Sequence, residues 1–274
     1  MTTMDNPLSI YFVPLDKVIL HEQTEPRRVE RLVNRLVDEK ILANPPIVAR
    51  MADNYVVLDG ATRVTALKQL NFPHILVHVV SPENGLGLQT WLHIIRSLEV
   101  GPLFNLLQKL PELVLKEISP QDLEDEALKQ GGLCYIYTVE DRVFLVYPAA
   151  GVSEAAALNK LTELYMEAGV ITRTLESDFA KLRVEFPDIT ALVVYPKYTI
   201  AQILEIAQAG QVVPAGITRF IIPGRVLRVN VELDYLKADL PLSEKNEWLR
   251  QFVIDKLKTN RARYYAEPVY LLDE

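Results

Sequence analysis

The sequence predicts an α+β protein built from two domains. The chain has 274 residues, a length at which two domains are more common than one. Hydrophobic residues make up 49% and charged residues 24%, which are the proportions of a globular protein. Apolar residues follow the period of a strand in some segments and that of a helix in others, and both kinds recur in each half of the chain.

The first part of the chain predicts strands and helices in alternation. Residues 27–39 carry apolar side chains at helical spacing, and the Asn-Pro-Pro sequence at 44–46 stops that helix. Two short apolar runs around 52–54 predict a strand pair. The expected elements are a strand over 9–20, a helix over 27–39, paired strands over 47–50 and 55–58, a helix over 64–70 and a strand over 75–80.

The remainder of the chain predicts a second set of elements. Ser153 is suited to cap a helix, and Gly169 stands just past the end of the same helix. The expected elements are a helix over 91–107, a hairpin of strands over 133–138 and 142–147, a helix over 153–168, a strand over 191–195, a helix over 200–209, two strands within 217–231 around Pro223-Gly224, a helix over 243–259 and a strand over 264–271. We therefore expect domains over 1–95 and 131–274, joined by a helical connector over 96–130.

Charge and apolar patterning exclude several classes of function. The net charge is −7, whereas proteins that neutralise DNA phosphates carry basic patches, so we do not expect DNA as a partner. No apolar run is long enough to span a bilayer, and the first residues lack the features of a secretion signal. Cys134 is the single cysteine, which excludes an internal disulfide and suits a reducing compartment. We expect a cytoplasmic protein with no membrane partner.

The segment Asp59-Gly60-Ala61-Thr62-Arg63 is the strongest candidate for a ligand site. It joins an expected strand to an expected helix, and the start of a helix offers backbone N–H groups and a partial positive charge to an anion. Arg63 adds a planar guanidinium that suits phosphate oxygens. Asp59 supplies a carboxylate for a metal ion or a ligand hydroxyl. The same five residues are also compatible with an ordinary turn and cap in which Arg63 pairs with a surface acid.

The setting of this segment resembles the ParB/sulfiredoxin superfamily. The resemblance rests on residues 13–14, 25–27, 46–48 and 57–66, where Gly60-x-x-Arg63 occupies the helix start that holds nucleotide phosphates in the superfamily. Residues 20–22, 213–220 and 223–225, with the C-terminal run 248–271, are similar to the free L-serine kinases of this superfamily. This resemblance implies a ParB/sulfiredoxin-like N-terminal domain that binds nucleotide, a C-terminal domain that binds substrate, and an active site in the cleft between them.

The resemblance also implies an activity and the residues that perform it. The activity is transfer of a phosphoryl group from ATP or ADP to the hydroxyl of free L-serine, with Mg²⁺, and the product, O-phosphoserine, would serve siderophore or cysteine biosynthesis. Glu22 matches the family's catalytic glutamate, for which we expect the role of general base. Asp59 is expected to be catalytic and to bind the metal, with Gly60, Ala61, Thr62 and Arg63 on the phosphates. His21, Trp91, Thr218 and Arg219 are the expected substrate-binding residues.

Structural roles for some of these residues stay open. Trp91 also fits a core aromatic, and Arg219 also fits a cross-strand pair on a strand. Thr62 departs from the family pattern, which has histidine before the motif arginine; a threonine hydroxyl can bond phosphate but cannot carry a positive charge. The alternative function is a ParB-like DNA-binding regulator that responds to nucleotide or haem, whose possible axial ligands are His21, His74, His78, His93 and Cys134.

Overall fold

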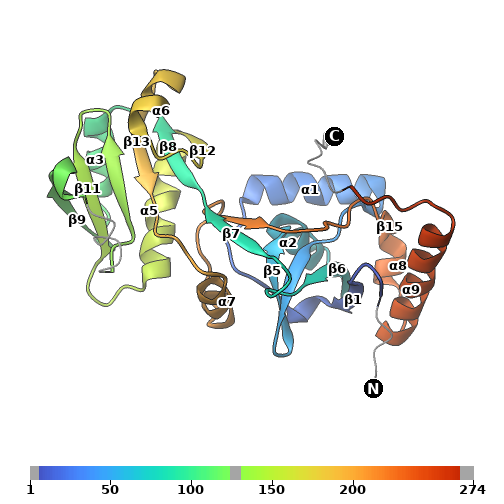
Figure 1. Ribbon diagram of the computed structural model, residues 1–274. Helices are drawn as coiled ribbons and strands as arrows, with labels where there is room; N and C mark the ends of the chain where they lie inside the picture. The colour runs from blue at the N-terminus through green and yellow to red at the C-terminus, as the bar shows by residue number, and fades with distance from the viewer. Residues whose placement is uncertain (1–5, 124–130, 266–274) are drawn as a thin grey trace. The chain divides into compact units, whose positions relative to one another are not determined.

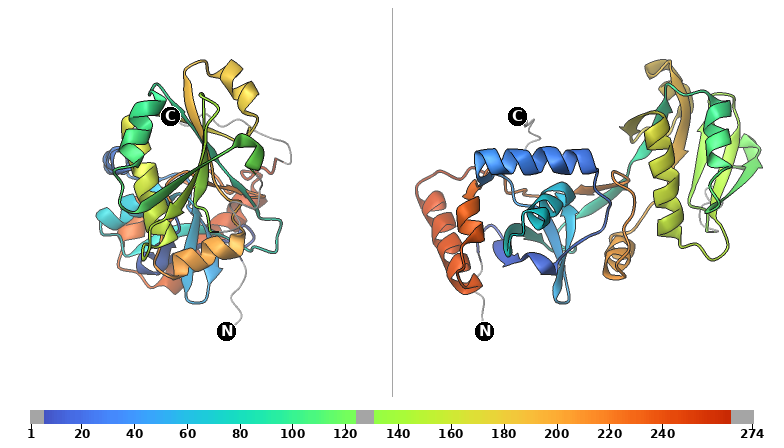
Figure 2. Two further views of the ribbon diagram at one scale, coloured as in Figure 1. Left: turned by 90° about the vertical axis from the view of Figure 1, so that its left-hand side faces the viewer. Right: turned by 180° about the vertical axis from the view of Figure 1, so that it is seen from behind.

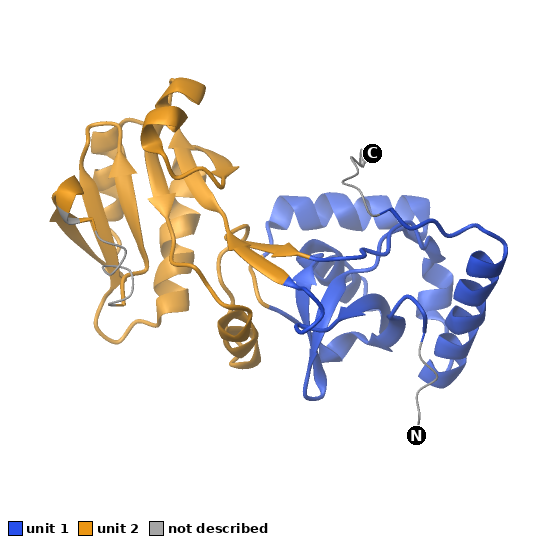
Figure 3. Cartoon of the chain, in the orientation of Figure 1, with its two compact units in different colours: residues 1–20, 24–86, 222–274 blue, residues 21–23, 87–221 orange. Residues whose placement is uncertain are grey.

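The computed structural model describes residues 6–123 and 131–265, which divide into two compact units (Figure 3). Unit 1 contains the described residues of 1–20, 24–86 and 222–274, and unit 2 contains those of 21–23 and 87–221. The chain thus leaves unit 1 for the short segment 21–23, leaves it again at residue 87, and returns at residue 222. Within the described residues, no helix has the length and apolar character needed to cross a bilayer.

Unit 1 is built on a five-stranded mixed sheet with the order β1-β6-β4-β5-β2 (Figure 1). β1 is antiparallel to β6, β4 is parallel to β6 and antiparallel to β5, and β2 is parallel to β5. The strands are β1 (Ile10–Pro14), β2 (Val18–Leu20), β4 (Ile47–Met51), β5 (Asn54–Asp59) and β6 (His74–Val80). The single strand expected over 9–20 is wrong, because the 3₁₀ turn η1 (Leu15–Lys17) interrupts it and sends its two halves to opposite edges of the sheet.

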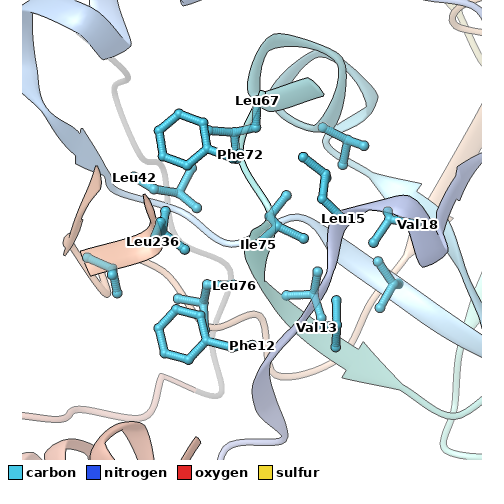
Figure 4. Close-up of a cluster of buried hydrophobic side chains, with 14 of the residues drawn as sticks. Phe12, Val13, Leu15, Val18, Leu42, Leu67, Phe72, Ile75, Leu76 and Leu236 are labelled. Carbon is cyan, nitrogen blue, oxygen red and sulfur yellow. The ribbon is translucent and has the colours of Figure 1, made fainter. Parts of the chain in front are cut away.

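The helices of unit 1 bury their apolar residues against this sheet. α1 (Pro26–Glu39) packs on α2 (Ala61–Gln69), whereas α8 (Leu233–Lys237) contacts β6 and α9 (Leu242–Lys258) contacts β1. A small ladder of β3 (Ile41–Leu42) and β15 (Val231–Glu232) ties the returning chain to the end of α1. Figure 4 shows the resulting core, in which side chains from β1, β6, α2 and α8 meet around Ile75 and Leu76.

Unit 2 is built on a six-stranded antiparallel sheet with the order β12-β8-β13-β10-β11-β9. Helices α3 (Val100–Leu107) and α5 (Glu154–Ala168) cover one face, and α6 (Phe179–Glu185) packs on the other (Figure 2). Ser153 caps α5 by accepting a bond from the N–H of Ala156, and Gly169 follows its end, as the sequence predicts. The strands are β8 (Leu92–Arg96), β9 (Leu113–Ile118), β10 (Cys134–Thr138), β11 (Val143–Pro148), β12 (Val170–Thr174) and β13 (Ile189–Val194).

A separate two-stranded ribbon in unit 2 carries several candidate residues. β7 (Gly87–Thr90) pairs antiparallel with β14 (Thr218–Ile221), so that Thr90 lies opposite Thr218 and Gln89 opposite Arg219. α7 (Ile200–Gln208) precedes this second strand, and its Thr199 and Gln202 form a reciprocal capping box. Two strands do occur within 217–231, but they do not pair with each other, because β14 pairs with β7 and β15 pairs with β3.

The helix expected over 91–107 is wrong in its first half, where β8 forms instead. Leu92 and Ile94 face α6, and Ile95 belongs to the cluster under α3 and α5. A strand buried on both faces produces a continuous apolar run, which periodicity alone does not distinguish from a buried helix. β12, α6 and α8 are further elements that the sequence pattern did not predict.

The compact units also divide the chain differently from the expected domains. Residues 113–118, expected in a helical connector, form β9 at the edge of the unit 2 sheet, and residues 222–265 lie with unit 1. The expected strands over 47–50, 55–58, 75–80, 133–138, 142–147 and 191–195 and the helices over 27–39, 64–70, 153–168, 200–209 and 243–259 are confirmed. The strand expected over 264–271 falls largely outside the described residues.

Candidate functional site

The turn from β5 into α2 holds the five-residue motif of unit 1. Gly60 is the N-cap of α2, and its φ of 98° lies in the left-handed region that glycine adopts without a steric cost. A Cβ at this position would lie 2.8 Å from Nη2 of Arg63. The absence of a side chain on Gly60 therefore allows the Arg63 guanidinium to fold back over the turn. Ala61, Thr62 and Arg63 form the first turn of α2, where backbone N–H groups are available to an anion.

The Arg63 guanidinium donates hydrogen bonds to backbone and side-chain acceptors of unit 1. Its Nη1 donates to the backbone oxygens of Asn44 (2.8 Å) and Pro45 (3.1 Å), and its Nη2 donates to Oδ2 of Asp59 (3.2 Å). The Asn-Pro-Pro turn thus anchors one side of the guanidinium while the carboxylate orients the other. This arrangement places the guanidinium of Arg63 at the start of α2 in a defined orientation.

Arg225 is a second cation on the same carboxylate. Its Nη1 donates to Oδ2 of Asp59 at 2.8 Å, although the two residues are 166 positions apart. Burial would raise the pKa of Asp59, but the charges of Arg63 and Arg225 outweigh it and hold that pKa below its usual value. Asp59 is therefore ionised at neutral pH. The sequence indicated Arg225 only through residues 223–225 of the family resemblance, because no local pattern links Arg225 to Asp59.

His78 lies on the same row of the unit 1 sheet as Asp59. Ile47 is paired with His78 on one side and with Asp59 on the other, so the two polar side chains project from the same face. His78 is 5% exposed, and its Nδ1 has no hydrogen-bond partner among the described residues. Burial and the charge of Arg225 lower the pKa of His78 to about 4. The unit 1 group thus comprises Asp59, Arg63, Arg225 and a neutral imidazole.

The segment 21–23 belongs to unit 2, where it pairs with Val213. The N–H of Val213 donates to the oxygen of His21 (2.8 Å), and the N–H of Gln23 donates to the oxygen of Val213 (2.9 Å). Glu22, between them, accepts a bond at Oε2 from the N–H of Gly216 (3.2 Å). The side chain of His21 is buried, with its Nε2 2.7 Å from Oγ1 of Thr218. Glu22 and His21 are thereby fixed on the loop 213–218.

Gly216 connects this loop to a buried polar network. Its φ is +77°, and its carbonyl oxygen accepts a bond from Nε2 of His93 (3.1 Å). Nδ1 of His93 lies 2.6 Å from the hydroxyl of Tyr165, which is hydrogen-bonded in turn to the hydroxyl of Tyr195. Burial is the main cause that lowers the pKa of His93 to about 4, so the ring is neutral and donates from Nε2. Sequence reasoning listed His93 only as a possible haem ligand.

The ribbon β7–β14 separates two of the expected substrate-binding residues. Side chains alternate between the faces of a strand, and Thr218 contacts His21, whereas the Arg219 guanidinium stacks on Trp91 (4.9 Å) and donates to Gln89 (2.9 Å). Trp91 and Arg219 therefore form one pair, and Thr218 belongs with His21 on the opposite face. Asp59, Gly60, Ala61, Thr62 and Arg63 all belong to unit 1. In unit 2, His21, Glu22 and Thr218 lie together at the loop that carries Gly216, and Trp91 and Arg219 form a separate pair.

Comparison with known proteins identifies relatives along almost the whole chain. The ATP-dependent L-serine kinase SbnI of Staphylococcus aureus is 28% identical over 264 residues, covering 96% of this chain and 96% of its own. The chain is a relative of the L-serine kinases. The ADP-dependent L-serine kinase SerK of Thermococcus kodakarensis is 22% identical and covers 82% of this chain and 92% of its own. These relatives are named as kinases and not as DNA-binding regulators. No family model matches the chain.

Solved structures show that the fold is also that of the serine kinases. The structure of SbnI with a C-terminal truncation, from Staphylococcus aureus, superposes with a TM-score of 0.71 at 24% identity, over 92% of this chain and 100% of its own. A free serine kinase in complex with AMP superposes with a TM-score of 0.70 at 19% identity, over 84% of this chain and 94% of its own. The mixed α+β fold expected from the sequence is confirmed.

The carboxylate of Asp59 fits a metal that also binds nucleotide phosphates. Among the described residues, no group of three or more His, Cys, Asp or Glu side chains could hold a metal ion by itself. Mg²⁺ in kinases commonly takes only one or two carboxylates, with water and phosphate oxygens completing its shell. Both arginine bonds to Asp59 end on Oδ2. Oδ1 is the oxygen of Asp59 that a metal–nucleotide complex could engage.

Proposed function

We propose that this protein transfers a phosphoryl group from ATP or ADP to the hydroxyl of free L-serine, giving O-phospho-L-serine. The observation that carries the proposal is the similarity to L-serine kinases over 96% of the chain. The alignment covers 96% of this chain and 96% of the relative, so the similarity extends to both compact units. One relative is named as ATP-dependent and another as ADP-dependent, so both nucleotides are tested as the phosphoryl donor.

Unit 1 is the proposed nucleotide-binding part, of the ParB/sulfiredoxin type. The first turn of α2 and the guanidinium groups of Arg63 and Arg225 supply donors for phosphate oxygens. Without nucleotide, both guanidinium groups neutralise Asp59. When they turn to the phosphates, Asp59 becomes available to Mg²⁺, which would neutralise developing charge on the transferred group. Thr62 contributes a hydroxyl at the position where the family resemblance implies a histidine.

Unit 2 is the proposed acceptor-binding part, with Glu22 as the general base. A general base must lie within hydrogen-bond reach of the hydroxyl whose proton it removes. The bond from the Gly216 N–H leaves Glu22 oriented, and the second carboxylate oxygen is the proposed proton acceptor. His21 and Thr218 line the same loop through their mutual hydrogen bond, which fixes the Thr218 hydroxyl next to the backbone that holds Glu22. Trp91 and Arg219 form a second, stacked surface of this unit.

The reaction requires both parts to act on one pair of substrates. The phosphoryl group held by the unit 1 residues has to meet the serine hydroxyl held by the unit 2 residues, with water excluded. Glu22 and Asp59 supply the two carboxylates of this reaction, one for the proton and one for the metal. We further propose that the reaction takes place in the cytoplasm, where nucleotides and free serine are available.

The decisive experiment is an assay of O-phosphoserine formation. The purified protein is incubated with L-serine and Mg²⁺ and with either ATP or ADP, and the product is quantified by mass spectrometry. We expect O-phosphoserine with at least one nucleotide, and no product when L-serine or Mg²⁺ is omitted. The absence of product with both nucleotides, from protein that binds them, would overturn the proposal.

A further inference from the structure

Arg173 brings a positive charge to the loop that holds Glu22. It lies on β12, the edge strand of the unit 2 sheet, and its guanidinium is seated against Gly216. A Cβ on Gly216 would lie 2.0 Å from Nη2 and 2.1 Å from Cζ of Arg173. A residue with a Cβ at position 216 would displace the guanidinium of Arg173 from this place. Gly216 thus accommodates both the positive φ and the guanidinium.

Arg173 has no ion-pair partner among the residues that the structure describes, although its charge helps to lower the pKa of the nearby His93. Other arginines of the same unit are ion-paired: Arg96 with Asp188 (2.9 Å), Arg142 with Glu117 (2.8 Å) and Arg183 with Asp141 (2.7 Å). In the part of the chain that the structure describes, Arg173 has no carboxylate within 4.0 Å. Its side chain is exposed to solvent. A guanidinium held beside a functional loop without an acid partner is suited to a ligand anion.

The position of Arg173 relative to Glu22 matches the size of an amino acid. The N–H of Gly216 donates to Glu22, and the Arg173 guanidinium lies against the same glycine. The carboxylate of Glu22 and the guanidinium of Arg173 are therefore both next to Gly216. In L-serine, the hydroxyl and the carboxylate are attached to adjacent carbon atoms. When the serine hydroxyl is bonded to Glu22, the serine carboxylate can therefore reach the Arg173 guanidinium on the other side of Gly216.

Arg219, the arginine expected to bind substrate, is engaged elsewhere. Its guanidinium stacks on Trp91 and donates to Gln89, on the face of β14 opposite to Thr218. Arg173 reaches this loop from a different strand of the sheet, which no sequence pattern indicates.

We propose that Arg173 binds the carboxylate of the acceptor and thereby selects a free α-amino acid over an amino alcohol or an uncharged serine derivative. The assignment rests on the proposed function, since it takes L-serine as the acceptor. The guanidinium offers two parallel N–H groups to the two carboxylate oxygens, a geometry that an uncharged amide does not match. Arg173 is thus a specificity-determining residue of unit 2.

Kinetics with two acceptors test the proposal. We expect Arg173→Gln to raise KM for L-serine about 10- to 100-fold, the range of a charge-assisted hydrogen-bond pair, with KM for the nucleotide unchanged. KM for L-serinamide, which lacks the negative charge, is expected to stay the same in the variant. Arg173→Lys, which retains the charge without the planar fork, is expected to fall between the parent and Arg173→Gln. Arg183→Gln, an arginine of the same unit paired with Asp141, is the matched control and is expected to behave as the parent does.

Calorimetry separates this proposal from the kinase proposal. Binding of L-serine is measured without turnover, so a parent protein that binds L-serine but forms no product contradicts the kinase function and still allows Arg173 to be tested. Loss of L-serine binding in Arg173→Gln supports the assignment. An equal loss of affinity for L-serine and L-serinamide, or a loss confined to Arg219→Gln, overturns it. Thermal unfolding of each variant verifies that the exposed substitution leaves the fold intact.

Discussion

The carboxylate of Glu22 accepts a hydrogen bond of 3.2 Å from the backbone N–H of Gly216, 194 positions later in the chain. The bond joins a three-residue segment near the N-terminus to a loop that follows the unit 2 sheet. It orients a carboxylate with a backbone donor, whose position does not depend on a flexible side chain. In unit 2, the Gly216 N–H thus helps to orient the proposed base.

Substitution of Glu22 tests the proposed base directly. We expect Glu22→Gln to lower kcat for O-phosphoserine formation by about 10²- to 10⁴-fold, because the amide cannot accept the proton of the serine hydroxyl. KM for the nucleotide is expected to change little. Glu25→Gln, an acid three residues away at the N-cap of α1, is the control and should retain the parent rate. Full activity of Glu22→Gln would contradict the role of Glu22 as base.

Gly216→Ala is expected to reduce activity much more than a comparable substitution elsewhere. The added methyl group would collide with the Arg173 guanidinium, and the alanine backbone would have to adopt a φ of +77°. Gly210 has a similar φ of +72°, but no atom lies within 4 Å of its hypothetical Cβ. Both variants should lose about 1 kcal/mol of stability from backbone strain. Only Gly216→Ala should also raise KM for L-serine. Equal kinetics in the two variants would show that the contact with Arg173 has no role.

The lowered pKa of His93 predicts how the stability of unit 2 depends on pH. Burial, the largest cause, lowers the pKa of His93 from 6.5 to about 4 in the folded protein, so between these values the unfolded chain binds a proton that the folded chain does not. Stability is therefore full above pH 6.5 and is lost as the pH falls toward 4, by about 2 kcal/mol at pH 4.5 from this group.

Urea denaturation at pH 7 and pH 4.5 measures this effect. In His93→Gln the amide donor can replace Nε2 toward the Gly216 oxygen, and the loss of stability on acidification should be smaller than in the parent protein. His93→Phe, which removes the donor, should lower stability at both pH values because the buried Tyr165 hydroxyl and the Gly216 oxygen lose a partner. An identical pH dependence in the parent and His93→Gln would show that His93 is not the titrating group.

The family resemblance leads us to expect histidine at position 62, so we predict that the threonine found there weakens nucleotide affinity. Thr62 lies in the first turn of α2, where a histidine would add a ring N–H toward phosphate oxygens. We expect Thr62→His to lower KM for the nucleotide about tenfold, with KM for L-serine unchanged. Thr62→Val, which removes the hydroxyl, should raise KM for the nucleotide. An unchanged nucleotide KM in both variants would place residue 62 outside the phosphate site.

Local signals in the sequence predicted most of the regular elements correctly. Helical periodicity identified α1 and α9, the Ser153 cap and Gly169 bounded α5, and turn residues separated β10 from β11. The failures came where pairing partners are distant. β8 was mistaken for a helix because both its faces are buried. The partners of β14 and β15 were not predicted, because each lies more than a hundred residues away.

The sequence by itself determined the turn Asp59–Arg63 and the place of Glu22, because short-range patterns and a family resemblance carry that information. Only the tertiary structure decided which residues surround them. Arg225 reaches Asp59, His93 holds Gly216, and Arg173 occupies the space above that glycine, each across more than 40 residues of chain. Hydrogen bonds and ion pairs of this kind depend on where strands and loops meet in space, and the spacing of residues along the chain does not encode that.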